Sequence, residues 1–436
     1  MRGNDPARIR HPDEQMTTGP QHPHRRPQFG PRVGHALQVL EETHDVVAGA
    51  QPGRDVRVRQ APHERLLDPL HRTGPQHAVG GVQAVERGVR EVRAGGGVRR
   101  DAEARRERQV VPPGALGRLD ELGEWLAAAQ SAVPVRPVER PRAVLFAGDH
   151  GIAELGVSAR PAGGAGVLVR EVLEGGRPVS VLARRLGVPV RVVDMSLDCD
   201  PESLPAEVSG HRVRRGGGRI DVEDALTTEE AEAAFRAGMA VADEEADSGT
   251  DLVVLGDVSV GGTTAAGVLV AALCGTDASV VTGRGGLPID DLAWMRKCAA
   301  IRDALRRARP VLGDQLQLLA TVGGADLTAM TGFLLQAAVR KMPVILDGVV
   351  SAACALVGQR VAFRAPDWWL ASHDSGEPGQ AKALDRMALE PLLSQGVTVG
   401  EGTGALLALP LVQAAAALAA ELPEESSADE AVTAAE

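Results

Sequence analysis

A single carboxylate stands in a glycine-rich turn near the C-terminal end of the chain, Gly400-Glu401-Gly402-Thr403-Gly404. The turn follows a β-rich stretch containing Val397 and Val399, and an apolar helix is expected to begin near Ala405. Parallel α/β sheets carry their chemistry in such turns, at the carboxyl ends of the strands. Glu401 is therefore a candidate functional residue, although a lone acid in a glycine turn can also be surface decoration.

A second glycine-rich segment, Gly256–Thr264, leads from an apolar run into an apolar helix expected over 265–272. Its composition is typical of a phosphate-binding loop, because glycines such as Gly261 expose backbone N–H groups and a helix N-terminus adds positive potential. A nucleoside-triphosphatase loop would carry lysine where this chain has Gly262. The segment, with the hydroxyls of Thr263 and Thr264, therefore suggests binding of a monophosphate.

Two further cationic positions fit an anionic substrate. Gly283-Arg284-Gly285 is another glycine turn, and its guanidinium can pair with phosphate or carboxylate through two hydrogen bonds. Lys297 lies near the start of a helix expected over 295–308. It is either a surface cation or a phosphate ligand.

Short apolar runs that end in small, polar or charged clusters recur from about residue 142 onward, separated by helix-length segments. The expected strands are 144–146, 252–255, 280–282, 321–322, 344–346 and 368–370. Continuous apolar strands alternating with helices indicate a parallel sheet covered on both faces. The predicted fold class is α/β with a Rossmann-like sheet, whose polar strand exits meet at one edge.

Composition narrows the possible functions. The chain has 436 residues, is 44% hydrophobic and carries a formal net charge of −11. That charge argues against a nucleic-acid surface, and we expect no membrane span because no sufficiently long apolar stretch is free of charge or glycine. The four cysteines lack metal-ligand spacing. The sequence thus predicts a cytoplasmic protein that uses no metal.

The first hundred residues differ from the rest, with sixteen arginines, no lysine, eleven acidic residues and eight of the eleven histidines. Such a segment buries too little apolar surface to offset its ordering entropy. We interpret 1–104 as a disordered extension or the product of a start site assigned too far upstream; a histidine-rich metal or polyanion arm is the alternative. The acidic stretch 421–436 is expected to be a disordered tail.

The motifs together resemble the nicotinate-nucleotide:dimethylbenzimidazole phosphoribosyltransferase family. The resemblance runs in order from about Arg105 to about Ala419. It rests on 112–119, 146–151, 256–264, 283–285, 290–291, 323–326, 346–348, 372–373, 377–378 and 400–404.

This resemblance implies a homodimeric enzyme, without metal or cofactor, that moves phosphoribose from nicotinate mononucleotide to 5,6-dimethylbenzimidazole in cobalamin synthesis. It also implies a large α/β domain, 142–402, and a small helical domain built from 105–141 and 403–420. Glu401 would be the general base, with Asp257, Val258 and Val399 at the aromatic base. The phosphoribosyl group would be held by Gly261, Thr263, Thr264, Gly283, Arg284, Gly285, Lys297, Ser372, Gly402 and Thr403.

Several positions depart from the family pattern. Gly262 replaces an asparagine, Ser259 a glycine and Val258 a methionine, and 163–167 lacks the usual polar residues. These changes leave two alternatives open, a relative that uses another azole or purine and a non-catalytic nucleotide-binding relative.

Other polar residues at strand exits have less certain roles. His150 is expected to be satisfied by the neighbouring Asp149, whereas Asp257 and Asp347 are candidates for ribose or base contacts. Trp368 and Trp369 are expected in the core or an interface.

Overall fold

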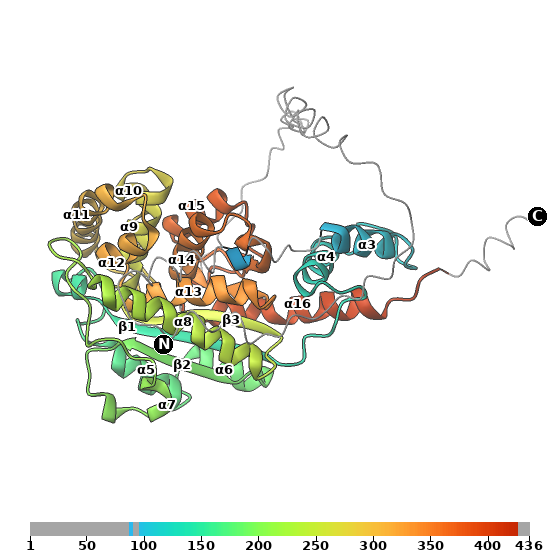
Figure 1. The fold of residues 1–436 in the computed structure, drawn as a ribbon, viewed down its shortest axis with the longest axis horizontal. Coiled ribbons are helices and arrows are strands. Elements are labelled where there is room, and N and C mark those ends of the chain that lie inside the picture. The colour runs from blue at the N-terminus through green and yellow to red at the C-terminus, as the bar shows by residue number, and fades with distance from the viewer. Residues whose placement is uncertain (1–86, 90–95, 426–436) are drawn as a thin grey trace, which may run out of the picture. The chain divides into compact units, whose positions relative to one another are not determined.

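A computed structural model describes residues 87–89 and 96–425 of the chain. It contains a five-stranded parallel sheet with the order β2-β1-β3-β4-β5 (Figure 1). The strands are β1 (Pro141–Asp149), β2 (Val190–Ser196), β3 (Leu252–Val260), β4 (Val344–Leu346) and β5 (Trp369–Ala371). The predicted α/β class with a parallel sheet is confirmed.

Apart from Arg142 at the start of β1, the neighbouring strands β1 and β3 carry polar residues only near their carboxyl ends. Phe146 pairs with Asp257, and Asp149 pairs with Val260, in the register of β1 with β3. The preceding residues of both strands are almost all buried, as expected for a sheet covered on both faces. The sheet therefore delivers its polar residues to one edge.

Helices cover both faces of the sheet, and alternate residues along the strands point into two separate cores. Val144 and Phe146 of β1 belong to one core, whereas Leu145 and Ala147 belong to the other. The first core includes α8 (Thr228–Asp247), α9 (Gly262–Cys274), α11 (Asp291–Ala308), α12 (Gln315–Val322), α13 (Ala325–Val339), α14 (Gly348–Val361) and α15 (Pro378–Met387). The second includes α4 (Arg118–Gln130), α5 (Ala165–Leu173), α6 (Pro178–Leu186), α7 (Ala206–Ser209) and α16 (Thr403–Glu421).

Segments from the two ends of the family-like region pack together, since α4 contacts both α3 (Gly96–Glu107) and α16. Residues 96–104, which we expected in the extension, form most of α3, because Val98 and Ala102 pack against the second core. Arg108 pairs with Glu424 at 2.8 Å, so the start of the expected tail also contacts α3 and its following turn. The remaining parts of these two expected segments, 1–86, 90–95 and 426–436, lie outside the described residues.

Three strand expectations were wrong. Residues 278–281 form the short helix α10 (Ala278–Val281), in which the Thr282 hydroxyl donates to the Ala278 carbonyl at 2.6 Å. The second expected strand, 321–322, is instead the end of helix α12, whose N-cap residue Asp314 accepts a hydrogen bond from the Gln317 amide. The third, 397–399, has no regular secondary structure. β-Branched residues favour strands only weakly. In these segments, helix capping and packing against neighbouring elements determine the secondary structure. Strand β2 was missed because Arg191 interrupts its apolar run.

Several helix predictions were confirmed. The helices α9, α11 and α16 lie where helices were expected, and Thr227 and Glu230 form a capping box at the start of α8. Trp368 and Trp369 are each 1% exposed and belong to the first core. Contrary to expectation, α16 is long and apolar enough to cross a membrane by length and composition, but half of that stretch is buried against the rest of the fold.

Candidate active site

Glu401 lies in a tightly held turn between β4, β3 and α16. Its backbone has φ 64°, a left-handed conformation that is uncommon for a residue with a side chain. The Gly402 and Ala405 amides both donate to the Asp347 carboxylate at 2.9 Å. A Cβ at Gly256 would lie 2.4 Å from the Gly402 nitrogen, so this position of β3 needs glycine. Contacts from neighbouring strands thus impose the unusual conformation of the turn.

The Glu401 side chain is buried and ion-paired. The residue is only 8% exposed, and its carboxylate accepts two hydrogen bonds from the Arg177 guanidinium. The Nε–Oε2 distance is 3.0 Å, and the second bond joins Nη2 to Oε1. Arg177 also bonds Glu171 at 3.2 Å through Nη1. Glu401 is therefore not surface decoration.

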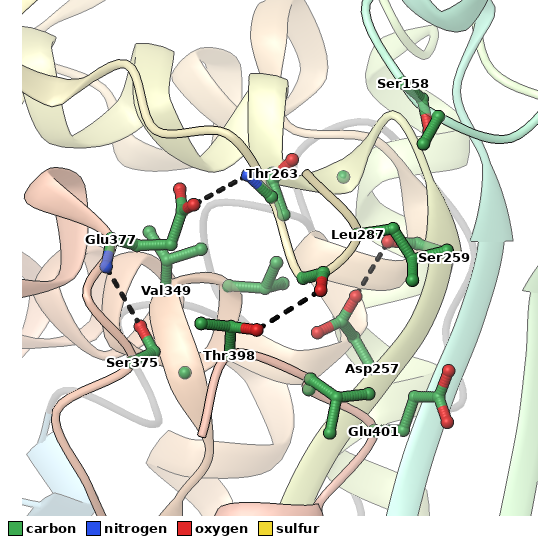
Figure 2. A pocket seen from close by; sticks show the side chains of 18 of the residues that line it. Ser158, Asp257, Ser259, Thr263, Leu287, Val349, Ser375, Glu377, Thr398 and Glu401 are labelled. Carbon is green, nitrogen blue, oxygen red and sulfur yellow. Dashed lines mark hydrogen bonds between the residues drawn. The ribbon is translucent and has the colours of Figure 1, made fainter. Parts of the chain in front are cut away.

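The turn opens on a pocket of about 950 Å³, counting space open to solvent. Figure 2 shows its lining, with Glu377 and Ser375 towards one side and Asp257, Ser259 and Glu401 towards the other. Eight of the residues expected at the site line this one pocket: Asp257, Gly261, Thr263, Arg284, Gly285, Lys297, Val399 and Glu401.

Six expected residues do not form the pocket wall. The Val258 side chain is fully buried in the second core, because alternate strand residues face opposite sides and Asp257 takes the pocket side. The others are Thr264, Gly283, Ser372, Gly402 and Thr403, which lie behind residues that line it. They adjoin the pocket wall rather than face its interior.

One end of the pocket is suited to an anion. Helix α9 begins there with the left-handed Gly261 at its N-cap, so the helix directs amide groups and positive potential towards the pocket. The Lys297 ammonium donates to the Thr263 hydroxyl at 3.0 Å, although Lys297 is only 1% exposed. Burial lowers the pKa of Lys297, and nearby Glu377 partly opposes that shift. Of the two interpretations of Lys297, a surface cation or a phosphate ligand, its burial excludes the surface cation.

The loop after residue 282 is organised by a carboxylate. Glu377 accepts the Gly285 amide at 2.7 Å, and a Cβ at Gly283 would lie 1.9 Å from its other oxygen. Arg284 lines the pocket, but its guanidinium bonds the Ile289 carbonyl and Asp291 at 2.7 and 2.6 Å. Arg284 thus stabilises its own loop, and Glu377 presents acceptor oxygens to the pocket.

Asp257 has unusual acid–base properties. Its carboxylate accepts the Ser259 hydroxyl at 2.7 Å, at the pocket side of β3 (Figure 2). Burial raises the pKa of Asp257 to about 7; the Ser259 bond opposes this shift, and the charges of Asp326, Asp347 and Glu401 add to it. Asp257 can therefore exchange a proton near neutral pH.

His150 lies behind the loop 256–264, outside the pocket wall. Its Nε2 lies 3.0 Å from an Asp326 oxygen, so the expectation that Asp149 satisfies the ring was wrong. Asp149 instead accepts the amides of Ala165 and Asp198. Burial would lower the pKa of His150, but the pair with Asp326 and two further carboxylates raises it. A Cβ at Gly261 would lie 3.0 Å from His150, which therefore supports the loop from below.

Sequence reasoning gave no role to three charged residues of the pocket wall, Arg160, Arg177 and Glu377. Arg177 lies in the loop between α5 and α6, and only its neighbouring glycines and Pro178 mark the position as a helix start. Glu377 was noted in a motif without a role, although it precedes Pro378 at the start of α15. Arg177 and Glu377 both come from helix starts far from Glu401 in sequence, so no local pattern links them to it.

Comparison with known proteins agrees with this geometry. A family described as Phosphoribosyltransferase matches residues 94–429. The nicotinate-nucleotide–dimethylbenzimidazole phosphoribosyltransferase of Streptomyces coelicolor is 90% identical over 341 residues, 78% of this chain and 95% of that protein. The protein of the same name from Mycobacterium tuberculosis is 50% identical, over 72% of this chain and 87% of its own length.

A solved structure extends the likeness to the fold. The crystal structure of CobT from Thermus thermophilus has a TM-score of 0.70 and 36% identity, covering 74% of this chain and 96% of that one. The matches identify an enzyme of the phosphoribosyl-transfer class. The chain belongs to the nicotinate-nucleotide:dimethylbenzimidazole phosphoribosyltransferase family.

Proposed function

We propose that this enzyme transfers phosphoribose from nicotinate mononucleotide to 5,6-dimethylbenzimidazole, giving α-ribazole 5′-phosphate and nicotinate. The observation that carries the proposal is that one pocket joins a buried carboxylate, Glu401, to a buried cation and a helix N-terminus at Lys297 and Gly261. A proton acceptor and an anion site in one cavity suit a phosphorylated sugar that reacts with an N–H base. The names of the relatives add support.

In the proposed reaction, Glu401 is the general base. One ring nitrogen of dimethylbenzimidazole attacks the ribose C1′ with its lone pair, and the ring N–H proton passes to the Glu401 carboxylate. General-base assistance of this kind typically accelerates a reaction about 10²–10⁴-fold. The electron pair of the broken C1′–N bond returns to the pyridine nitrogen of nicotinate. That nitrogen is positively charged in the substrate and leaves neutral, so its departure needs no acid.

The remaining task of the site is to hold two flat rings on opposite sides of one sugar. Attack opposite the leaving group converts a β-nucleotide into an α-nucleotide. We assign the aromatic acceptor to the end of the pocket with Asp257, Val399 and Glu401, with Val258 packed behind it. Hydrogen bonding by Asp257, which titrates near neutral pH, would help to orient the acceptor.

The phosphoribosyl group is assigned to the opposite end. Its phosphate would contact Gly261, Thr263 and Lys297, and Glu377 would accept hydrogen bonds from ribose hydroxyls. Arg284 and Gly285 lie at the border of this region. They would contact phosphate after the loop 283–285 changes conformation. The expected residues behind the wall, Thr264, Gly283, Ser372, Gly402 and Thr403, would act by holding these loops.

The experiment is to incubate the full-length protein with nicotinate mononucleotide and a panel of benzimidazoles, other azoles and purines. Formation of α-ribazole phosphate, at a higher kcat/KM than any other adduct, is the expected result. A preferred adduct with another base would favour the alternative transferase. Tight binding of nicotinate mononucleotide without any turnover would favour a non-catalytic relative.

We also propose a cytoplasmic homodimer that needs no metal or cofactor and binds neither nucleic acid nor membrane. Helix α11 displays Leu292 and Met295, which are 66% and 60% exposed, and such apolar side chains suit a subunit interface. Within this subunit, 142–402 would form the catalytic domain and 105–141 with 403–420 the small helical domain. Light scattering of the purified protein would measure its oligomeric state.

A further inference from the structure

Arg177 is the one cation that contacts both oxygens of Glu401 within the described part of the chain. Its side chain is 15% exposed and lies on the wall of the same pocket. A guanidinium with two parallel hydrogen bonds to a carboxylate fixes direction as well as distance. The pair therefore determines where the Glu401 carboxylate lies before any substrate arrives.

Arg177 is itself held in place from several directions. It is the N-cap residue of α6 and precedes Pro178, whose ring restricts the backbone at the helix start. The Ser180 hydroxyl donates to the Val172 carbonyl at 2.7 Å, which links α6 to the end of α5. Glu171 of α5 holds the guanidinium from the side opposite Glu401. The arginine thus has an anchor that is independent of its catalytic partner.

Glu401 needs such a support because its own side chain has several rotatable bonds. The Asp347 contacts hold the backbone of the turn but do not reach the Glu401 carboxylate. The Arg177 pKa is raised, chiefly by its hydrogen bond to Glu401, so the guanidinium stays charged at every working pH. Without it, the carboxylate could turn among rotamers that do not reach the acceptor.

We propose that Arg177 is a positioning residue for Glu401, and that the chain Glu171–Arg177–Glu401 presents a correctly directed carboxylate to the acceptor base. The proposal deepens the proposed function and rests on it. One Glu401 oxygen leaves the guanidinium to receive the acceptor proton, while the other keeps its hydrogen bond. Arg177 neither gains nor loses a proton during the reaction.

Other charged or titratable side chains lie around the same pocket, so a change of pH dependence must be assigned by comparing variants. Arg160, Asp257, Asp347 and His373 line the pocket, and Glu171 bonds Arg177. All of them remain when Arg177 alone is replaced. Lysine at position 177 keeps the positive charge but loses the two-bond geometry, whereas methionine loses both.

The experiment compares Arg177→Lys, Arg177→Met and Glu171→Gln with the wild type. We expect Arg177→Met to lower kcat about 10²-fold and change KM for nicotinate mononucleotide less than about threefold, since misdirected general bases lose most of their effect. Its acidic limb of kcat against pH should move to higher pH, because a carboxylate without a neighbouring cation binds its proton more readily. Arg177→Lys should keep the acidic limb in place while recovering only part of kcat. Glu171→Gln should cause a smaller loss of kcat.

Arg191→Met is a matched control, because Arg191 is also a half-buried arginine paired with two carboxylates, Glu244 and Glu245, away from the pocket. It should lower thermal stability about as much as Arg177→Met without altering kcat or its pH profile. Equal kcat losses in these two variants, in proportion to their stability, would show that Arg177 is only structural. An unaltered or faster kcat in Arg177→Met would also overturn the proposal.

A measurement that does not require catalytic turnover can test the role of Arg177 independently of the proposed function. Infrared difference spectra against Glu401→Gln report the pH at which the Glu401 carboxylate protonates. The midpoint should rise in Arg177→Met and stay near the wild-type value in Arg177→Lys; equal midpoints in all three proteins would overturn the positioning role. Lack of product from the wild type with every base would instead refute the proposed function.

Discussion

Asp347 and Gly402 are joined by a 2.9 Å hydrogen bond, in which the Gly402 amide donates to a carboxylate oxygen at the end of β4. The second oxygen of Asp347 accepts the Ala405 amide at the same distance. Asp347 therefore connects the carboxyl edge of the sheet to the first turn of α16. Because Glu401 lies immediately before Gly402, this buried aspartate holds the Glu401 turn against the end of β4.

Replacing Asp347 by asparagine should disturb that turn. The amide nitrogen of asparagine cannot accept a hydrogen bond, so one of the two backbone N–H groups would face a second donor. We expect the free energy of unfolding to fall by about 1–3 kcal/mol and kcat to fall about 10- to 100-fold. Urea unfolding and steady-state kinetics measure the two effects.

Asp194→Asn provides the control for this prediction. Asp194 is also fully buried and accepts a backbone amide, that of Leu197 at 2.8 Å, but it lies away from the pocket. The control should lose stability and keep its kcat. If both variants lose kcat equally, Asp347 has no special connection with the Glu401 turn.

Glu401→Gln tests the general base directly. The substitution keeps the shape of the side chain and removes its capacity to take up a proton. We expect kcat to fall at least about 10²-fold while the dissociation constant of nicotinate mononucleotide changes little, because the proposed phosphate site is at the other end of the pocket. Calorimetric titration confirms binding by the folded variant. An undiminished kcat would remove Glu401 from the mechanism.

Lys297→Met tests the proposed phosphate site. A hydrogen bond to a charged group contributes about 1.5–3 kcal/mol, so KM for nicotinate mononucleotide should rise about 10- to 100-fold. KM for the aromatic acceptor should change much less. Lys382→Met removes a lysine outside the pocket and serves as the matched control. A uniform change in both KM values would argue against a phosphate contact.

The Asp257 carboxyl predicts a dependence of stability on pH. Its pKa is about 7 in the folded protein, against about 3.9 for an unperturbed aspartate. The folded state therefore holds the proton more tightly. The stability that this proton provides is complete below about pH 4 and is lost as the pH rises through 7.

Asp257→Asn removes that dependence. The variant should gain stability relative to the wild type between pH 5 and pH 8, as measured by urea unfolding at a series of pH values. Each unit of pKa difference corresponds to about 1.4 kcal/mol, so the trend is large enough to resolve. A constant difference between the two proteins across this range would show that Asp257 titrates normally.

The fold class, the family and the outline of the chemistry could all be predicted from the amino-acid sequence. Glycine-rich exits after apolar runs predict polar residues at one edge of a parallel sheet, and Glu401, Asp257, Thr263 and Lys297 do line one pocket there. These features are local: a turn needs glycine, a helix N-terminus attracts an anion, and a continuous apolar run needs a covered sheet.

The tertiary structure alone decided which partners these residues have. Arg177 is 224 positions from Glu401 in the chain, and Asp326 lies 176 positions from His150, so only the packing of helices around the sheet brings each pair together. The same holds for Val258, whose side chain belongs to the core because Asp257 takes the pocket side of β3. Local conformational preference determines turns and helix ends. Burial and long-range contacts determine which partners a charged group has, and short sequence patterns do not predict these partners.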